Sequence, residues 1–178
     1  TVIVDVKADA TTEGAETLNL VLSNGAKVTA DVAVNDVSLT PAAVAKTFTL
    51  TTGTEAVVGT AQDDTITGVI SDAEKTLNVS DTIDGGAGSD TLSLVVGTAA
   101  AAVSLDGFTV SGVEKFSVRN VSGQTASQNF ALITGETSFT SNVSTSAVTV
   151  TNLAAGATAT IVGNGAATNG ATNIGYEA

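Results

Sequence analysis

One nine-residue segment limits the possible folds of this chain more than any other feature of its sequence. Residues 85–93 read GGAGSDTLS and match the repeat pattern G-G-x-G-x-D-x-U-x, in which U is apolar, at every specified position. Glycines at positions 85, 86 and 88 permit positive φ and a tight turn that aims main-chain carbonyls inward. Asp90 then supplies a carboxylate, and Leu92 starts a short strand whose side chain enters a core. The segment predicts a turn-and-strand unit that needs a similar unit to stack against.

The chain contains a degenerate copy of this unit. Residues 59–67 read GTAQDDTIT, with a glycine first, Asp64 in the sixth position and Ile66 in the apolar one. Thr60 and Gln62 stand where the intact pattern has its second and fourth glycines. We therefore expect 59–67 to form the neighbouring turn of the stack.

A third acidic piece, residues 81–84, reads DTID and runs directly into the intact copy. Stacking 59–67 against 81–93 requires residues 68–80 to leave the stack as an insertion. Carbonyl and carboxylate oxygens are the ligands that Ca²⁺ prefers, six to eight of them at about 2.3–2.6 Å, and one nonapeptide supplies only half of such a site. We predict a calcium site between the two copies, with these candidate ligands: Gln62, Asp63, Asp64, Asp81, Asp84, Gly86, Gly88 and Asp90.

The predicted crowding of up to five carboxylates has an energetic consequence. Without a cation, each close pair would repel by roughly a kcal/mol or more at surface dielectric, and bound Ca²⁺ would turn this repulsion into stabilisation of the fold. An ordinary glycine loop without a ligand remains an alternative. A phosphate cradle is disfavoured, because it needs a lysine or a helix N-terminus and neither is near.

Charge and composition limit the possible functions. Six basic residues against 18 acidic ones give a net charge of −12, and eight of the acids lie within residues 47–90. Nucleic acids are poor partners for such a chain, because their binding depends on neutralising phosphates. His and Cys are absent, and neither H-E-x-x-H nor G-x-S-x-G occurs, so we predict no enzymatic activity. The longest apolar stretch, residues 92–103, is short and interrupted, which predicts no membrane insertion.

The first 46 residues predict strands of an incomplete sheet. Val2, Val4 and Val6 alternate as in a half-buried strand, and residues 17–34 read TLNLVLSNGAKVTADVAV. Asn24-Gly25 between alternating segments is a strong hairpin signal. Pro41 marks a boundary. Three strands rarely make an independent domain, so we expect this chain to be a fragment, its sheet completed by residues before Thr1 or by another chain.

Residues 47–178 predict an all-β region without helical periodicity. Short apolar pairs such as Phe116/Val118 and Val148/Val150 alternate with Gly, Asn and Ser turns. This pattern fits the turns of a solenoid or the strands of a sandwich. We favour the solenoid, because small Ala, Thr and Val side chains suit closely stacked turns. Glu114-Lys115 is predicted to be a solvated strand edge and Asp106-Gly107 a turn.

The region from about 47 to 165 resembles the bacterial repeats-in-toxin (RTX) calcium-binding proteins, in the form found in surface-layer proteins and giant adhesins. The resemblance lies in residues 48–54, 59–66 and 81–92, and the 110–118 and 148–162 segments resemble the turns that follow. It implies secretion without a cleaved signal and folding in the calcium-rich extracellular medium. One intact copy beside one degenerate copy predicts a single calcium staple instead of a long calcium-filled roll.

The first segment resembles the end of a Calx-β domain, an immunoglobulin-like calcium-binding sandwich. The similarity lies in residues 9–18, which read DATTEGAETL, and in Asn35-Asp36 after the last strand. In that family acids near these positions bind Ca²⁺, and Glu13, Glu16 and Asp36 match them. The acids of earlier strands are missing here, so calcium binding by this segment stays open.

Together these features predict an all-β chain. Residues 1–46 would be the C-terminal strands of a Calx-β or immunoglobulin-like domain, and 47–178 an RTX-like calcium-stapled β-solenoid. The predicted function is a non-enzymatic structural module at the bacterial cell surface, with self-association or neighbouring domains as partners. The alternative is the non-catalytic RTX portion of a secreted hydrolase or toxin. A module that binds glycans through calcium is disfavoured, because the chain has no Trp, one Tyr and five Phe.

Overall fold

A computed structural model describes residues 16–21, 27–34, 43–163 and 170–178 of the chain. The chain divides into two compact units, Thr1–Ala42 and Ala43–Ala178. All regular structure in the described residues is β, and none of it is helical. The all-β prediction is therefore confirmed. No helix long and apolar enough to cross a membrane occurs in these same residues.

The first unit contains one described strand pair. Strands β1 (Glu16–Val21) and β2 (Lys27–Val34) pair antiparallel, with Leu18 opposite Val32 and Leu20 opposite Val28. The predicted pairing of these two segments is confirmed. The Asn24-Gly25 turn, the Val2–Val6 segment and Pro41 lie outside the described residues.

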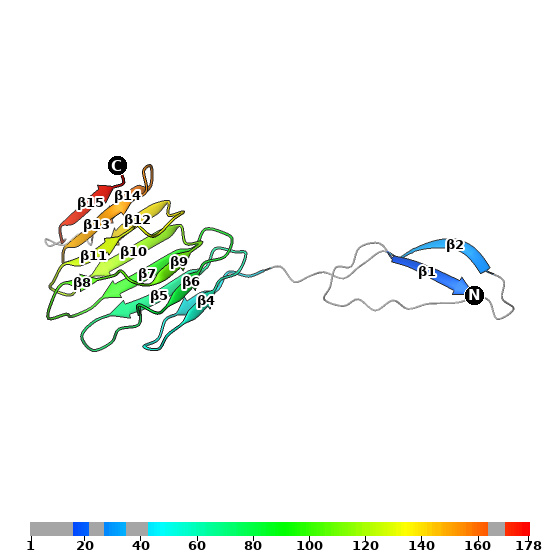
Figure 1. Ribbon diagram of the computed structural model, residues 1–178, viewed down its shortest axis with the longest axis horizontal. Coiled ribbons are helices and arrows are strands. Elements are labelled where there is room, and N and C mark those ends of the chain that lie inside the picture. Colours follow the sequence, from blue (N-terminus) through cyan, green and yellow to red (C-terminus); the bar gives the residue numbers. More distant parts are fainter. Residues whose placement is uncertain (1–15, 22–26, 35–42, 164–169) are drawn as a thin grey trace. The chain divides into compact units, whose positions relative to one another are not determined.

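The second unit is a parallel β-solenoid, as Figure 1 shows. Its longest sheet stacks six strands, each paired in parallel with the next. These strands are β3 (Thr47–Thr49), β5 (Thr65–Ile70), β7 (Thr91–Val96), β10 (Lys115–Asn120), β12 (Ser138–Asn142) and β14 (Thr158–Val162). The solenoid prediction is confirmed over the sandwich, because consecutive strands of one sheet are parallel and joined through a full turn of chain.

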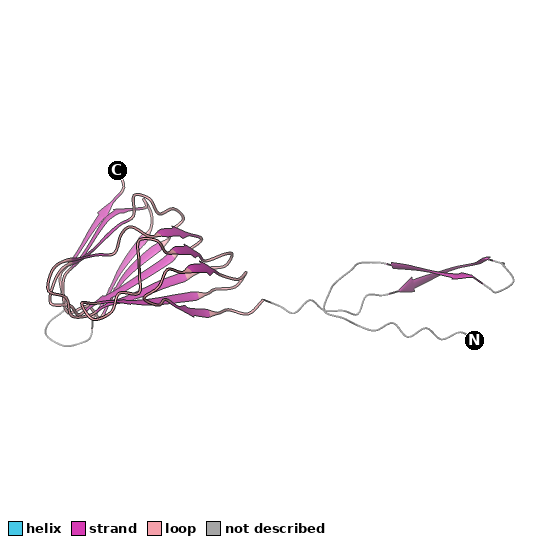
Figure 2. Cartoon of the chain, turned by 60° about the horizontal axis from the view of Figure 1, so that its bottom comes forward, coloured by secondary structure: helices cyan, strands magenta, loops and turns pink. Residues whose placement is uncertain are grey.

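Two shorter sheets close the other sides of the stack (Figure 2). The second sheet contains β4 (Ala56–Val58), β6 (Thr82–Asp84) and β9 (Thr109–Ser111), and the third contains β8 (Val103–Ser104), β11 (Ala126–Asn129), β13 (Val148–Leu153) and β15 (Thr172–Tyr176). The turn that follows β7 contains both β8 and β9. The turns that precede it in the chain have strands in the first and second sheets, and the turns that follow it have strands in the first and third. The cross-section therefore changes along the stack.

The alternating side chains of the long sheet build the core. In β5 and β7 every second residue is buried, because successive side chains of a strand point to opposite faces. Ile66, Leu92 and Phe116 occupy the same register position in consecutive turns, and each is at most 3% exposed. The predicted inward placement of Leu92 is confirmed.

Three phenylalanines pack together in the core of the later turns. The Phe130 ring lies 4.9 Å from that of Phe116 and 6.1 Å from that of Phe139, both edge-on. Such perpendicular contacts are favourable because the positive ring edge meets the negative ring face. Phe130 and Phe139 are fully buried, so a chain poor in aromatic residues uses them in the core.

The segment between the two nonapeptides differs from the predicted insertion. Strand β5 continues to Ile70 and pairs with β7 as far as Val96. Beyond it, Thr76 and Leu77 are only 2% and 4% exposed. The segment therefore supplies strand residues and buried core residues to its turn. Burial of the apolar Leu77 side chain stabilises the fold although the residue lies in a long connection.

Replacing Phe130 with Ala should destabilise the solenoid by about 3–5 kcal/mol, the usual cost of truncating a buried phenylalanine. The reason is the loss of both edge-on contacts together with a cavity in the centre of the upper turns. Chemical denaturation followed by circular dichroism measures the effect. Leu132→Ala is the matched control, since Leu132 is 95% exposed and its truncation should leave the midpoint unchanged. Equal midpoints for both variants would contradict this packing account.

Candidate metal centre

The two nonapeptides occupy equivalent positions in consecutive turns of the solenoid. The Gly59 N–H donates to the Asp84 carbonyl at 2.7 Å, and the Ala87 N–H donates to the Thr60 carbonyl at 3.0 Å. The strands that follow them also pair in register, with Thr65 opposite Thr91. We call residues 59–64 and 85–90 together the glycine-rich corner. The structure thus shows the predicted stacking of the degenerate copy on the intact one.

Each glycine of this corner is required for a different reason. Gly86 and Gly88 have φ of 93° and 123°, a region that side chains rarely enter, and the predicted positive φ is confirmed there. Gly85 is needed because the next turn is close: a Cβ would lie 1.9 Å from the Gly112 carbonyl oxygen. At Gly59 a Cβ would lie 1.8 Å from the Gly85 carbonyl oxygen. The stacking distance between turns therefore excludes any side chain at these two positions.

Three acids form a column beside the glycines, each immediately before a strand of the long sheet. We call Asp64, Asp90 and Glu114 the acid column. The Lys46 N–H donates to Asp64 Oδ1 at 2.6 Å, the Asp64 N–H to Asp90 Oδ1 at 2.6 Å, and the Asp90 N–H to Glu114 Oε2 at 2.8 Å. Each carboxylate therefore accepts a main-chain hydrogen bond from the preceding turn and links two turns where the strand ladder begins.

The two aspartates of the column differ in how their second oxygen is satisfied. Asp64 Oδ2 accepts the Thr60 N–H at 2.5 Å, and Oδ1 also accepts the Thr60 hydroxyl at 3.1 Å. Asp90 Oδ2 is buried and has no hydrogen-bond partner among the described residues. Asp90 itself is 0% exposed. The intact nonapeptide therefore leaves a carboxylate oxygen unpaired, whereas the degenerate copy does not.

The pKa of each aspartate shifts in the direction that these contacts require. Burial raises the pKa of Asp64, but the hydrogen bonds from Thr60 and Lys46 together lower this pKa by more than burial raises it. The net shift is therefore downward. Burial also raises the pKa of Asp90, and the nearby charges of Glu114 and other acids add to this rise. The hydrogen bond from the Asp64 N–H lowers the pKa, but the net shift is upward. Burial and the neighbouring acids therefore disfavour the charged form of Asp90, which a nearby cation would favour.

The difference originates at the second residue of each copy. Thr60 directs its N–H at the aspartate of its own turn. Gly86 occupies the same place in the intact copy, but with φ of 93°, and its N–H donates to Asp84 Oδ1 at 3.2 Å instead. In the intact copy, the motif glycine Gly86 therefore leaves one oxygen of the motif aspartate Asp90 unpaired.

The other predicted ligands divide into two groups. Asp63 lies at the corner, where its Oδ1 accepts the Ser89 N–H at 2.9 Å, and Gln62 is exposed beside it. Asp81 lies at the opposite end of β6 from Asp84, with its oxygens accepting the Glu55 N–H at 3.0 Å and the Asn78 N–H at 2.6 Å. Asp81 is therefore separated from the corner, and its carboxylate stabilises a loop.

No three acidic side chains in the part of the chain that the structure describes form a group that could hold a metal ion. A cation at the glycine-rich corner would consequently take most of its ligands from main-chain carbonyls and water. The side chains available to it are Asp90, with its unpaired oxygen, and the exposed carboxylates of Asp84 and Asp63. Asp64 is less available, because both of its oxygens already accept hydrogen bonds.

Sequence reasoning missed the role of Glu114. The prediction of a solvated strand edge was wrong for this residue, which is half-buried and accepts the Asp90 N–H. The sequence position relative to the strands could have revealed it. Asp64, Asp90 and Glu114 each directly precede the first residue of a strand, and these first residues, Thr65, Thr91 and Lys115, lie at the same register position. Glu114 follows Gly112 after two residues instead of five, which hides this equivalence in a motif search.

Comparison with known proteins adds no family to this geometry. The chain matches no protein-family model, no curated protein and no solved structure. What the corner can do must therefore be argued from its own contacts.

Replacing Glu114 with Ala should destabilise the solenoid by about 1–3 kcal/mol, because the Asp90 N–H would lose its acceptor in a partly buried place. Glu114→Gln should recover most of this loss, since the amide oxygen can accept the same bond. Thermal unfolding followed by circular dichroism measures both. A Glu114→Ala variant with the same melting temperature as the wild type would show that the column has no structural role.

Gly59→Ala should cost about 1–3 kcal/mol or more, because the new methyl group would collide with the main chain of the next turn, which cannot move independently. Gly53→Ala is the matched control: its Cβ would meet only ordinary contacts of 3.4 Å or longer. Urea midpoints of the two variants provide the comparison. A Gly59 variant as stable as the Gly53 variant would show that the turns are less closely stacked than described.

Proposed function

We propose that this chain is a calcium-stabilised, non-enzymatic structural module of a bacterial surface-layer, adhesin or filament protein of the RTX type, exposed to the extracellular medium. The observation that supports the calcium part most directly is the buried, unpaired Oδ2 of Asp90 in the intact nonapeptide. A buried carboxylate oxygen without a partner is costly. A cation bound beside it would remove that cost and stabilise the folded state.

The chemistry of the corner suits calcium among the common cations. The available ligand atoms are all oxygens, and they come from carboxylates, main-chain carbonyls of a glycine turn and solvent. Ca²⁺ accepts six to eight such ligands in irregular geometry, whereas Mg²⁺ demands a near-ideal octahedron. Zinc prefers nitrogen and sulfur ligands, and the chain has neither His nor Cys. One ion at the intact copy, held by Asp90 with Asp84 or Asp63 and carbonyls of residues 85–88, is the proposed arrangement.

The rest of the chain supports a scaffold function. The long sheet continues through six parallel strands in register, so each turn is fixed to its neighbours by a ladder of main-chain bonds. A calcium ion at the corner would lock the turns that contain β5 and β7 and thereby the lower part of the stack. Folding would then depend on calcium in the surrounding medium, which agrees with secretion of an unfolded chain.

The first unit fits this proposal as the end of a Calx-β-like domain. Its described part is the antiparallel pair β1–β2. Glu16 begins β1, whereas Glu13 and Asp36 lie outside the described residues. A two-stranded sheet is marginal by itself, so a neighbouring domain or a second chain is the proposed partner that completes it.

Wild-type protein should melt at a higher temperature in calcium than in chelator. At a calcium concentration 100 times the dissociation constant, the gain in unfolding free energy should be about 2.7 kcal/mol. Asp90→Asn should abolish this gain, and in chelator it should be at least as stable as the wild type. The reason is that Asn keeps one oxygen for the Asp64 N–H and removes an uncompensated buried charge. Scanning calorimetry of both proteins in both buffers makes the measurement.

Asp64→Asn is the matched control in the adjacent turn. It should lower the melting temperature in both buffers, because the two oxygens of Asp64 accept three hydrogen bonds and an amide offers only one acceptor oxygen. Magnesium in place of calcium should produce little shift. The proposed site would be refuted if the wild type had the same melting temperature in calcium and in chelator. It would also be refuted if calcium raised the melting temperature of Asp90→Asn as much as that of the wild type.

A further inference from the structure

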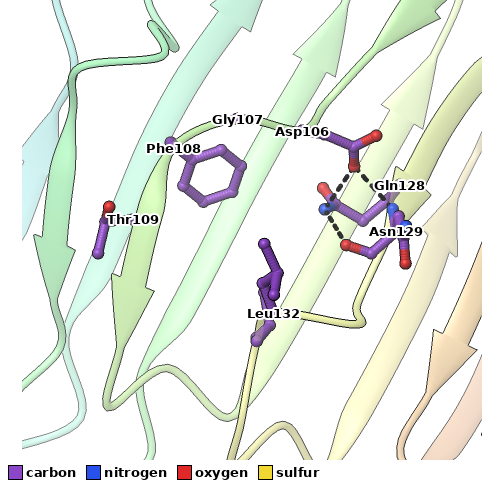
Figure 3. A pocket seen from close by; sticks show the side chains of 8 residues that line it. Asp106, Gly107, Phe108, Thr109, Gln128, Asn129 and Leu132 are labelled. Atoms are coloured by element: carbon purple, nitrogen blue, oxygen red, sulfur yellow. Dashed lines mark hydrogen bonds between the residues drawn. The ribbon is translucent and has the colours of Figure 1, made fainter.

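A cavity lies where the second sheet of the solenoid ends. Strand β9 pairs with β6 on one side, and no strand in the described residues pairs with its other side. The chain of the next turn passes this place through residues 130–137 without forming a strand. Between β9 and this loop remains a cavity of about 310 Å³, drawn in Figure 3. This volume is at the lower end of the range of about 300–1,000 Å³ found for small-molecule sites.

One wall of the cavity is apolar. Phe108 packs partly against the core and turns the rest of its ring toward the cavity, and Leu132 projects toward it from the opposite loop (Figure 3). Ile133 also lines the cavity and is 8% exposed. Leu132, by contrast, is 95% exposed. The Leu132 side chain therefore gains little from burial within the fold, and it is accessible to a ligand in the cavity that it lines.

The other wall is polar and held rigidly. Asp106 accepts the Asn129 N–H at 2.7 Å, the Gln128 Nε2–H at 3.2 Å and the Ser104 hydroxyl at 2.9 Å. Asn129 Oδ1 in turn accepts the Ala131 N–H at 3.0 Å and the Asn152 Nδ2–H at 2.8 Å. These bonds fix the orientation of both side chains. They leave lone pairs on the exposed Asp106 carboxylate as acceptors and the Asn129 amide NH₂ group as a donor toward solvent.

We propose that this cavity binds a single ring of a neutral carbohydrate. The apolar C–H face of a pyranose would lie on Phe108 and Leu132, and its hydroxyl groups would donate to Asp106 and accept from Asn129. A sugar ring has this combination of one apolar face and a polar edge with both donors and acceptors. The site is separate from the glycine-rich corner, so it involves no calcium.

Other ligand classes fit the walls less well. An anion would face the Asp106 carboxylate in a chain of net charge −12. A wholly apolar ligand would desolvate the Asp106 carboxylate without replacing its bonds to water, which costs free energy. A cationic group would find one carboxylate that already accepts three hydrogen bonds and no second charge to hold it. A neutral polyhydroxyl ring avoids all three costs.

The test uses the full chain in calcium buffer and a panel of neutral oligosaccharides built from glucose, mannose, galactose or N-acetylglucosamine. Ligand-observed NMR and calorimetry should find saturable binding of at least one of them with a dissociation constant of about 1 mM, the weak range expected for one ring. Leu132→Ser should weaken this binding at least tenfold (about 1.4 kcal/mol) without changing the melting temperature. Phe108→Leu, which keeps the packing volume but removes the flat ring, should weaken it similarly.

Val58→Ser is the matched control, because Val58 is also exposed (70%) and lies on β4, away from the cavity. Its affinity for the bound oligosaccharide should equal that of the wild type. The proposal is overturned if no oligosaccharide of the panel saturates the protein, or if Leu132→Ser and Val58→Ser bind equally well. Saturable binding of a lysine-rich peptide with no binding of any sugar would also overturn it.

Discussion

The constant spacing between stacked turns is the constraint on which the rest of this structure depends. Parallel strands lie about 4.8 Å apart, and the corners that join them must keep the same spacing although they have no regular ladder of their own. At the glycine-rich corner this excludes a side chain at Gly59 and Gly85, where a Cβ would lie under 2 Å from the next turn. The main-chain N–H groups left over at the corner then need acceptors, and carboxylates of neighbouring turns supply them.

The acidic character of the chain follows in part from this requirement. Carboxylates accept main-chain N–H groups across turns not only in the acid column but also at Asp63, Asp72 and Asp106. These hydrogen bonds give the carboxylates partners within the fold, so such acids need no cation to be tolerated. Asp90 differs from these acids because one of its oxygens is buried and unpaired, as one oxygen also is at Glu55 and at Glu136. The number of acids in the sequence therefore overstates the number available for metal binding, and individual hydrogen bonds decide which ones remain.

Much of the fold could be predicted from the sequence, because the stacked unit is local. The nonapeptide places a turn, an acid and an inward apolar residue within nine positions, and its degenerate copy has the same spacing. The hairpin partners around Asn24-Gly25 were also local, and their pairing is as expected. What could not be predicted depends on the turns above and below. Leu77 is buried within a supposed insertion, and Glu114 belongs to the column only because its shorter corner still ends at the same register position.

The hydrogen bonds of the acid column all run in one direction along the stack. In each, the main-chain donor belongs to the earlier turn and the carboxylate acceptor to the later one, from Lys46 through Asp64 and Asp90 to Glu114. Along the acid column the two faces of a turn are therefore chemically unequal, whereas the bond from the Ser89 N–H to Asp63 at the same corner runs in the opposite direction. If the later neighbour of a turn were removed, the turn would present an N–H group without its acceptor. If the earlier neighbour were removed, the turn would present a carboxylate, which water solvates well. The acid column thus has a polarity that the sheets, with alternating donors and acceptors on both edges, do not have.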